Sequence, residues 1–252
     1  MLKYFFLILT IALQSWSAHP DKIIGENDFV MVNADATNIP LKYKDLVDAV
    51  GLLKSGCTVT HIGFGYALTA GHCFWAPAVG KMHLPCDEGE TIAWGLREGV
   101  EPYLISRCDE IIMAQHNADY DFAVIKVSPA PKAMVGVDLD RQPIVNDPLT
   151  LFSHPDGETL RWSGVCKVEE PEHPDFSKLA LHHQCDTIRI SSGAALISEL
   201  NLKVVAIHDG GADPEPERVD PSPLPIFKTG SNYGTFILGT PLENILRELG
   251  FK

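Results

Sequence analysis

Hydrophobic residues in this chain occur in short runs that alternate with polar residues or are bounded by turn-forming ones. Such runs follow one another between residues 57 and 127, and again between residues 149 and 208. Many short strands at this spacing are typical of β-sandwiches and β-barrels. The pattern therefore predicts an all-β protein, with strands over Cys57–Ile62, Tyr66–Thr69, Thr91–Trp94, Tyr103–Ile105, Glu110–Met113, Phe122–Val127, Leu149–Phe152, Trp162–Val168, Leu179–His182, Ala194–Ile197 and Val204–His208.

Two segments depart from this β pattern. Leu41–Leu53 has apolar residues at roughly helical spacing, which is compatible with a helical turn that leads into a strand, but the sequence leaves this assignment open. Near the C-terminus, Thr240 is a good helix N-cap, Pro241 fits the first helical position and Glu243 would complete a capping box. A closing helix is therefore expected over residues 241–249.

Prolines divide the chain into two halves. A proline-rich stretch begins at Ser128-Pro129-Ala130-Pro131 and lasts to about Pro148. We interpret it as a linker between an N-terminal half of about 23–130 and a C-terminal half of about 145–238. A second proline-rich stretch, Asp213–Pro225, also carries several acidic residues and is expected to be a surface loop.

The N-terminus has the features of an export signal. Met1-Leu2-Lys3 precedes an apolar run, Tyr4–Leu13, and small residues follow it. This pattern predicts a signal peptide over 1–17, with cleavage after Ala18 as the alternative. Lys22-Ile23 would then be cleavable by a trypsin-like enzyme after a short propeptide, 18–22. The rest of the chain is then a secreted protein, extracellular or periplasmic, that has no membrane partner once the signal is removed.

Charge and cysteine content agree with this compartment. The 252 residues carry a net charge of −13, which argues against a nucleic-acid partner because such proteins present a basic face. An even number of cysteines on an exported chain favours disulfides. Their order favours the neighbouring pairs Cys57–Cys73, Cys86–Cys108 and Cys166–Cys185, although six cysteines allow 15 connectivities.

A metal site is the rival interpretation of these cysteines. Two segments, His72-Cys73 and His182-His183-Gln184-Cys185, superficially resemble clusters of metal ligands. Their separations lack the paired spacing of zinc modules, so we expect neither a metal nor any other cofactor.

Three residues are candidates for nucleophilic catalysis. His72 lies among small residues in Thr69-Ala70-Gly71-His72-Cys73, and histidine is the usual general base near neutral pH. Asp121 begins a buried strand and needs a partner such as a histidine N–H, because an unpaired buried charge is costly; it is favoured over Asp119. Ser192 precedes Gly193, which permits a tight turn that exposes the hydroxyl for activation by a base.

Taken together, these motifs resemble the chymotrypsin-like serine proteases, most closely the bacterial trypsin-like and glutamyl endopeptidase branch. The histidine motif matches almost letter for letter, and Cys57–Cys73 resembles the family's histidine-loop disulfide. Other matching stretches are Ile23–Asp28, Asp121–Val124, Ser153–Gly157, Cys185–Thr187 with Ser191–Gly193, and Val204–Gly211.

The resemblance implies two six-stranded antiparallel β-barrels with the active site between them. It implies that His72 is the general base, that Asp121 orients it, and that Ser192 attacks the scissile carbonyl. The N–H groups of Ile190 and Ser192 would form the oxyanion hole. The peptide or protein substrate would pair with the strand at Asp209, Gly210 and Gly211, and we expect the protein to act as a monomer.

The chain departs from the family at two positions beside the serine. Ile190 stands where glycine is usual, and a β-branched residue resists a positive φ. Ser191 replaces the aspartate that pairs with the new N-terminus in trypsin-like zymogens. These departures motivate a rival function, a protease homologue that binds peptides or proteins without turnover.

Specificity depends on two opposed candidates. Thr187 and His208 match positions that contact an acidic P1 side chain in the glutamyl branch. A buried histidine with a structural role is the alternative for His208, and Asp186 near the pocket would instead favour Arg or Lys.

Overall fold

The structure is a computed structural model that describes residues 23–74, 80–170, 180–212 and 231–252. The predicted signal peptide 1–17, the propeptide 18–22 and the whole Asp213–Pro225 loop lie outside the described residues. In the described part of the chain, the only α-helix is far too short to cross a bilayer.

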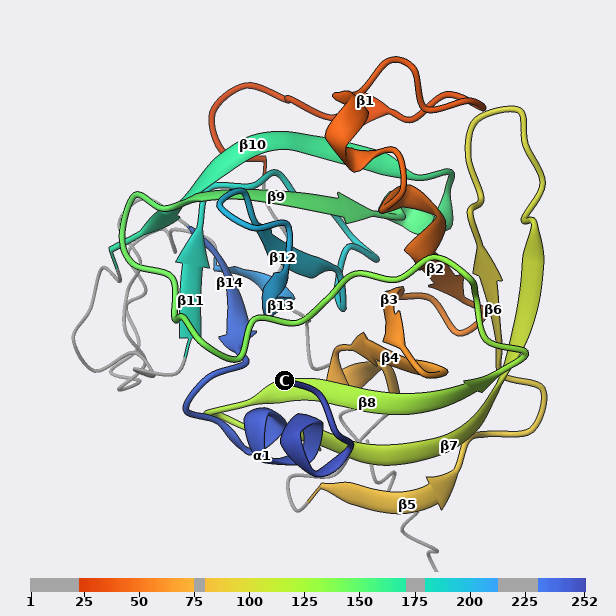
Figure 1. The fold of residues 1–252 in the computed structure, drawn as a ribbon. Helices are drawn as coiled ribbons and strands as arrows, with labels where there is room; N and C mark the ends of the chain where they lie inside the picture. The colour runs from red at the N-terminus through yellow and green to blue at the C-terminus, as the bar shows by residue number, and fades with distance from the viewer. Residues whose placement is uncertain (1–22, 75–79, 171–179, 213–230) are drawn as a thin grey trace, which may run out of the picture.

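Two closed six-stranded antiparallel barrels form the molecule (Figure 1). In the first barrel, β7 and β8 pair to close a sheet with the order β7-β6-β2-β3-β4-β8, and β5 extends its edge beside β7. The strands are β2 (Val50–Leu53), β3 (Thr58–Gly63), β4 (Tyr66–Thr69), β5 (Lys81–Pro85), β6 (Thr91–Trp94), β7 (Leu104–His116) and β8 (Asp121–Ser128).

The second barrel has the order β10-β11-β14-β13-β12-β9 and closes where β9 pairs with β10. The short β1 pairs with the outer edge of β10. The strands are β1 (Val30–Met31), β9 (Pro148–Ser153), β10 (Arg161–Glu169), β11 (Ala180–His183), β12 (Ala195–Ser198), β13 (Val204–Ala212) and β14 (Ser231–Phe236).

Helical structure is limited to one α-helix and four single turns in the described residues. The helix α1 (Pro241–Glu248) closes the chain where it was expected. The segment before β2, which the sequence left open, contains two 3-10 turns. The 3-10 turns are η1 (Leu41–Tyr43), η2 (Val47–Ala49), η3 (Gly71–Phe74) and η4 (Pro155–Gly157).

The all-β prediction and the barrel architecture are confirmed, and three details are corrected. The pieces expected at 103–105 and 110–113 form one long strand, β7, whose outer positions are polar. The segment between the predicted strands Tyr66–Thr69 and Thr91–Trp94, for which no strand was expected, contains β5. At α1 the predicted capping box is wrong, because the Thr240 hydroxyl contacts the carbonyls of Phe236 and Ile237 while Glu243 accepts the N–H of Gly239.

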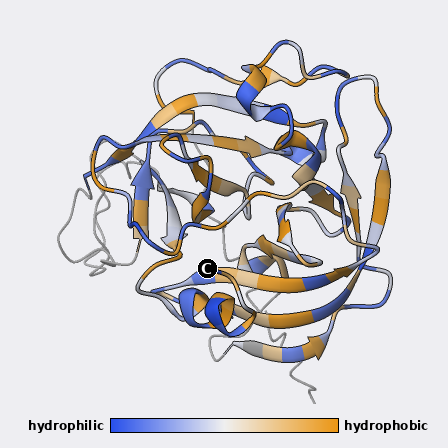
Figure 2. Ribbon diagram, in the orientation of Figure 1, coloured by the Kyte–Doolittle hydropathy of each residue, from blue (hydrophilic) through white to orange (hydrophobic). Residues whose placement is uncertain are grey.

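Three hydrophobic clusters explain why several strands are continuously apolar. In β8, Ala123, Ile125 and Val127 fill the first barrel, while Phe122 and Val124 belong to a cluster shared by both barrels and α1. Successive side chains of a strand point to opposite faces, so a strand between two cores is apolar at every position. Figure 2 shows this as orange segments along the strands where the barrels meet. A third cluster fills the second barrel.

Three disulfides join neighbouring cysteines in the order that the sequence favoured. Cys57–Cys73 and Cys86–Cys108 lie in the first barrel, and Cys166–Cys185 lies in the second. The Cys57–Cys73 bridge fixes η3, the turn that carries His72, to the start of β3.

Candidate active site

His72 lies on η3, directly after β4, and its position depends on Gly71. A Cβ on Gly71 would lie 1.9 Å from the carbonyl oxygen of Gln115, so only glycine lets the turn approach the end of β7 this closely. The His72 side chain is 31% exposed. The turn therefore presents a partly accessible imidazole on a rigid backbone.

Asp121, the first residue of β8, holds His72 through two contacts. Its Oδ1 accepts the backbone N–H of His72 at 2.9 Å, and its Oδ2 lies 2.6 Å from the ring Nδ1. A carboxylate beside Nδ1 favours the tautomer with the proton on that nitrogen, which leaves Nε2 as a proton acceptor. Asp119, the competing candidate, is exposed in the hairpin loop.

A second imidazole, that of His116, also meets Asp121. His116 Nδ1 lies 3.1 Å from Asp121 Oδ2, and the two histidine rings are arranged edge-to-face with centroids 5.7 Å apart. Burial by itself would raise the pKa of the Asp121 carboxyl, but His116 and His72 outweigh it and hold the pKa below its usual range. The carboxylate in turn raises the pKa of His116.

Ser192 lies in the turn between β11 and β12 of the second barrel, which packs against the first. The Ser192 carbonyl accepts the N–H of Thr58 at 2.9 Å. A Cβ on Gly193, whose φ is +86°, would lie 2.1 Å from Thr69 Oγ1, so this glycine allows the turn to contact the strand that leads to His72. The Ser192 hydroxyl donates to the Asp209 carbonyl at 3.2 Å.

The backbone just before Ser192 has the positive φ that a β-branched residue at position 190 was expected to resist. Ile190 adopts a φ of 71°, in the left-handed region that favours glycine. In the described part of the chain, neither the Ile190 N–H nor the Ser192 N–H donates to a protein acceptor. Ser191, in the place of the family's aspartate, is buried and contacts the Ser153 hydroxyl at 3.1 Å.

Thr187 and His208 are both fully buried behind this turn. His208 Nδ1 lies 3.1 Å from Nε2 of His183, another buried histidine. Burial lowers the pKa of His183 well below its usual value. Thr187 Oγ1 has no hydrogen-bond partner among the described residues, which leaves one buried hydroxyl able to bind a further polar group.

Asp186, the other specificity candidate, binds the N-terminal segment of the chain. Its two carboxylate oxygens accept the N–H groups of Ile24 at 2.8 Å and Asp28 at 2.7 Å. Both oxygens are thus already hydrogen-bonded. Burial raises the pKa of this carboxyl.

Asp209, Gly210 and Gly211 lie in β13, beyond the point where β12 stops pairing with it. Ile207 is the last residue of β13 that pairs with β12. On the other edge of β13, pairing with β14 continues as far as Ala212. The Asp209 carboxylate accepts from the Thr235 hydroxyl, which in turn accepts the N–H of Asp121 at 2.9 Å. Thr235 thus connects the two barrels beside Asp121.

Two clusters of potential metal ligands occur among the described residues. In the first, Cys57 and Cys73 flank His72, but their sulfurs form a disulfide and are not thiolates. Cys185 of the second sequence-predicted cluster is likewise bonded to Cys166. His72, His116 and Asp121 form the other group, with donor atoms within 4.8 Å of one another.

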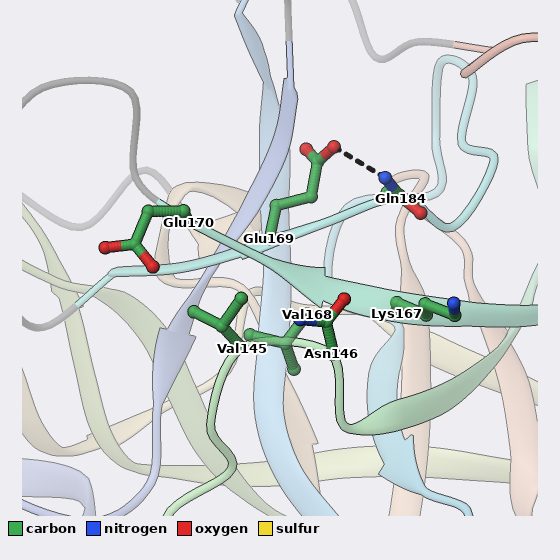
Figure 3. Close-up of a pocket in the computed structure, with 7 residues that line it drawn as sticks. All are labelled: Val145, Asn146, Lys167, Val168, Glu169, Glu170 and Gln184. Carbon is green, nitrogen blue, oxygen red and sulfur yellow. Dashed lines mark hydrogen bonds between the residues drawn. The ribbon is translucent and has the colours of Figure 1, made fainter.

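A surface cavity of about 260 Å³ lies elsewhere, beside β10 (Figure 3). Glu169 accepts a hydrogen bond from Gln184 at its rim. None of the candidate catalytic residues lines it. Its lining residues are Val145, Asn146, Lys167, Val168, Glu169, Glu170 and Gln184.

No protein-family model and no curated protein matches the sequence. Solved structures do match in fold. A Glu endopeptidase in complex with MPD superposes with a TM-score of 0.63 at 15% identity, over 90% of this chain and 98% of that one. Inactive forms of the Rv3671c protease, one of them from M. tuberculosis H37Rv, give TM-scores of 0.53 and 0.52 at 13% identity, over 90% and 88% of this chain and 97% and 98% of theirs. The protein has a chymotrypsin-like fold.

In this chymotrypsin-like fold, His72 and Asp121 come from the first barrel and Ser192 from the second. Sequence reasoning missed His116 and Thr235. The signal for His116 was its place just before the short Asn117–Tyr120 loop, since strand pairing across such a hairpin sets it opposite Asp121. Thr235 lies in β14, whose mostly polar residues gave no strand signal.

Proposed function

We propose that the protein is a secreted serine endopeptidase that uses His72, Asp121 and Ser192. The observation that carries the proposal is the pair of contacts from the Asp121 carboxylate to the His72 ring and backbone. This arrangement leaves Nε2 to take a proton, which is what a general base in acyl transfer requires. The fold it shares with solved proteases supports the same reaction class.

In the proposed reaction, His72 Nε2 removes the Ser192 hydroxyl proton as Oγ attacks the scissile carbonyl. The imidazolium then donates that proton to the leaving amine, and water hydrolyses the acyl-enzyme by the same route. Asp121 remains ionised throughout and stabilises the imidazolium. Rotation of the Ser192 hydroxyl away from the Asp209 carbonyl is required before the attack.

The oxyanion is proposed to bind the N–H groups of Ile190 and Ser192. The left-handed φ of Ile190 gives the turn a glycine-like backbone, and the two N–H groups have no acceptor among the described residues. Removing one such donor by mutation raises the activation free energy of acyl transfer by about 3 kcal/mol. The conformation of Ile190 therefore favours a catalytic function, and not the rival function of a homologue that only binds peptides.

The substrate is proposed to be an extended peptide with an acidic P1 residue. Pairing of β13 with β12 ends at Ile207, and such a peptide is proposed to lie as an added strand beside the following segment, Asp209–Gly211. Thr187 and His208 would contact the P1 carboxylate, and the Thr187 hydroxyl, which has no hydrogen-bond partner in the described part of the chain, supports this. Asp186 is an unsuitable partner for Arg or Lys because it already accepts two N–H groups. The three disulfides suit an oxidising compartment outside the cytosol.

The reaction is tested with a fluorophosphonate probe, which requires base, nucleophile and oxyanion hole together. We expect the processed wild-type protein to be labelled and Ser192→Ala to remain unlabelled. A Ser191→Ala variant is the matched control. It removes the hydroxyl of the neighbouring serine and keeps that of Ser192, so we expect it to be labelled. Absence of labelling in folded wild-type protein would favour the binding function.

The P1 preference is tested by cleavage of a peptide library. We expect cleavage after Glu, and a Thr187→Val variant, which keeps the side-chain shape, should lose most of its preference for Glu over Gln. Cleavage after Arg or Lys would contradict the assignment to Thr187 and His208.

A further inference from the structure

The pairing of β7 with β8 brings an additional histidine to the proposed catalytic pair. His116 is the last residue of β7, Asp121 is the first of β8, and the two are direct partners in the antiparallel ladder. Directly opposite residues in such a ladder have their Cβ atoms about 5 Å apart on the same face of the sheet. His116 therefore faces Asp121 because of strand register.

The three side chains present their ligand atoms to one small volume. Asp121 Oδ2 lies 2.6 Å from His72 Nδ1 and 3.1 Å from His116 Nδ1. The His116 nitrogen is buried, and although close to the carboxylate it is not aligned for a hydrogen bond. The side chains of His72 and His116 are 31% and 43% exposed, so the two rings border solvent, and their Nδ1 atoms face the Asp121 carboxylate.

We propose that His72, His116 and Asp121 form a site for a divalent transition metal ion, Zn²⁺ in particular, that reversibly blocks the catalytic pair. Two imidazoles and one carboxylate are a donor set that Zn²⁺ uses, with bonds of about 2.0–2.2 Å and a fourth position for water. Tetrahedral bonds of that length set donor atoms about 3.3 Å apart. The separation between Asp121 Oδ2 and His116 Nδ1 is already close to this value, and the His72 contact must lengthen by less than 1 Å.

Metal binding changes the tautomer of His72. The Nδ1 lone pair binds the metal only after its proton has left, and the neutral ligand ring then carries its proton on Nε2. No acceptor remains on the ring for the serine proton. This loss of activity rests on the proposed function, whereas the metal binding rests on the three side chains alone.

The site is tested by calorimetric titration of Zn²⁺ alone into the full mature chain carrying Ser192→Ala, which keeps all three ligands. We expect one equivalent to bind. Adding His116→Gln should weaken binding at least about 100-fold, since loss of even an outer partner of a metal ligand costs about 10–100-fold. The matched control is His83→Gln, an exposed histidine paired with Glu110, which should leave the affinity within about twofold.

Several outcomes separate the proposals. Equal Zn²⁺ affinity with and without His116, or no stoichiometric binding to folded protein, would overturn the metal site whether or not the protein is a protease. In protein that the probe labels, Zn²⁺ should slow labelling, a chelator should restore it, and His116→Gln should remove the effect. Circular dichroism checks the fold, and His116→Asn replaces the glutamine variant if that variant does not fold.

Discussion

Ile190 adopts a backbone conformation that its side chain disfavours, and its N–H has no protein acceptor in the described structure. A left-handed φ costs an L-residue about 1–2 kcal/mol, and a β-branched residue rarely adopts it. The Ile190 side chain lies beside Gly56 and Gly157, within 4 Å of where their Cβ atoms would be. Contacts from both barrels therefore surround the residue that is held in this conformation.

The first prediction concerns this residue. Ile190→Gly removes the strain and keeps the N–H, so we expect the rate of fluorophosphonate labelling to stay within about threefold of wild type or to rise. Ile190→Val, which keeps the branched Cβ, is the matched control and should behave as wild type. A fall of more than tenfold in the glycine variant alone would mean that the side chain, and not the backbone, supports the site.

The second prediction concerns Asp121. Asp121→Asn replaces the oxygen that orients His72 Nδ1 and favours the wrong tautomer, so the labelling rate should fall by about 10⁴-fold. Asp119→Asn, two residues earlier and exposed, should leave the rate unchanged. A similar loss in both variants would contradict the specific role of Asp121.

Among the elements, the N-terminal segment is held in an unexpected way. The sequence suggested Asp186 as a specificity residue, yet its carboxylate binds the backbone of residues 24 and 28. Backbone N–H groups in an irregular segment need acceptors, and a buried carboxylate satisfies two of them at once. The segment that would follow cleavage at Lys22-Ile23 is thereby fixed to the Asp186 side chain.

The third prediction tests this element. Asp186→Ala leaves two N–H groups without their acceptor, so the free energy of unfolding should fall by about 1–3 kcal/mol. Amide hydrogen exchange at Ile24 and Asp28 should become faster, while exchange in β8 responds less. Glu26→Ala, an exposed change within the same segment, is the control for both measurements. Unchanged protection at the two amides would show that other contacts hold the segment.

Elements were predictable from sequence where one face or both faces of a strand are apolar. The run Phe122–Val127 was identified because both faces of β8 are buried. The long β7 appeared as two fragments because outward-facing Arg107 and Asp109 interrupt its apolar pattern. The strand β14 was missed because polar residues dominate it, and its register is set by pairing with β11 and β13.

At the scale of the whole molecule, the two barrels are connected by hydrogen bonds as well as by the shared hydrophobic cluster. The backbone N–H of His154, which follows β9, donates to Thr58 Oγ1 of β3 at 2.9 Å. The His154 side chain is fully buried, its Nδ1–H donates to the Glu158 carbonyl, and burial lowers its pKa to about 4. This histidine is therefore neutral in the folded protein at neutral pH.

The fourth prediction follows from that pKa. In the unfolded chain His154 titrates near pH 6.5, so below that pH the unfolded state binds more protons and the folded state loses stability until about pH 4. Between pH 7 and pH 4.5 this group alone should remove about 2 kcal/mol from the free energy of unfolding. In urea unfolding, the free energy of unfolding of His154→Asn should fall less between pH 7 and pH 4.5 than that of the wild type. The control His83→Asn, at an exposed site, should show the same fall as the wild type.

The sequence by itself determined the β class, the division into two halves, the cysteine pairing that the structure contains, and the residues that carry the proposed chemistry. These follow from local signals: strand periodicity, turn residues and short motifs around His72, Asp121 and Ser192. The tertiary structure decided the conformation of Ile190, the hydrogen bonds of Asp186 and the approach of His116 to Asp121. The first two depend on contacts between segments far apart in the chain, and such contacts leave no pattern in the order of the residues. The third depends on the register of the β7–β8 hairpin, which the short loop between His116 and Asp121 indicates but only the folded strands fix.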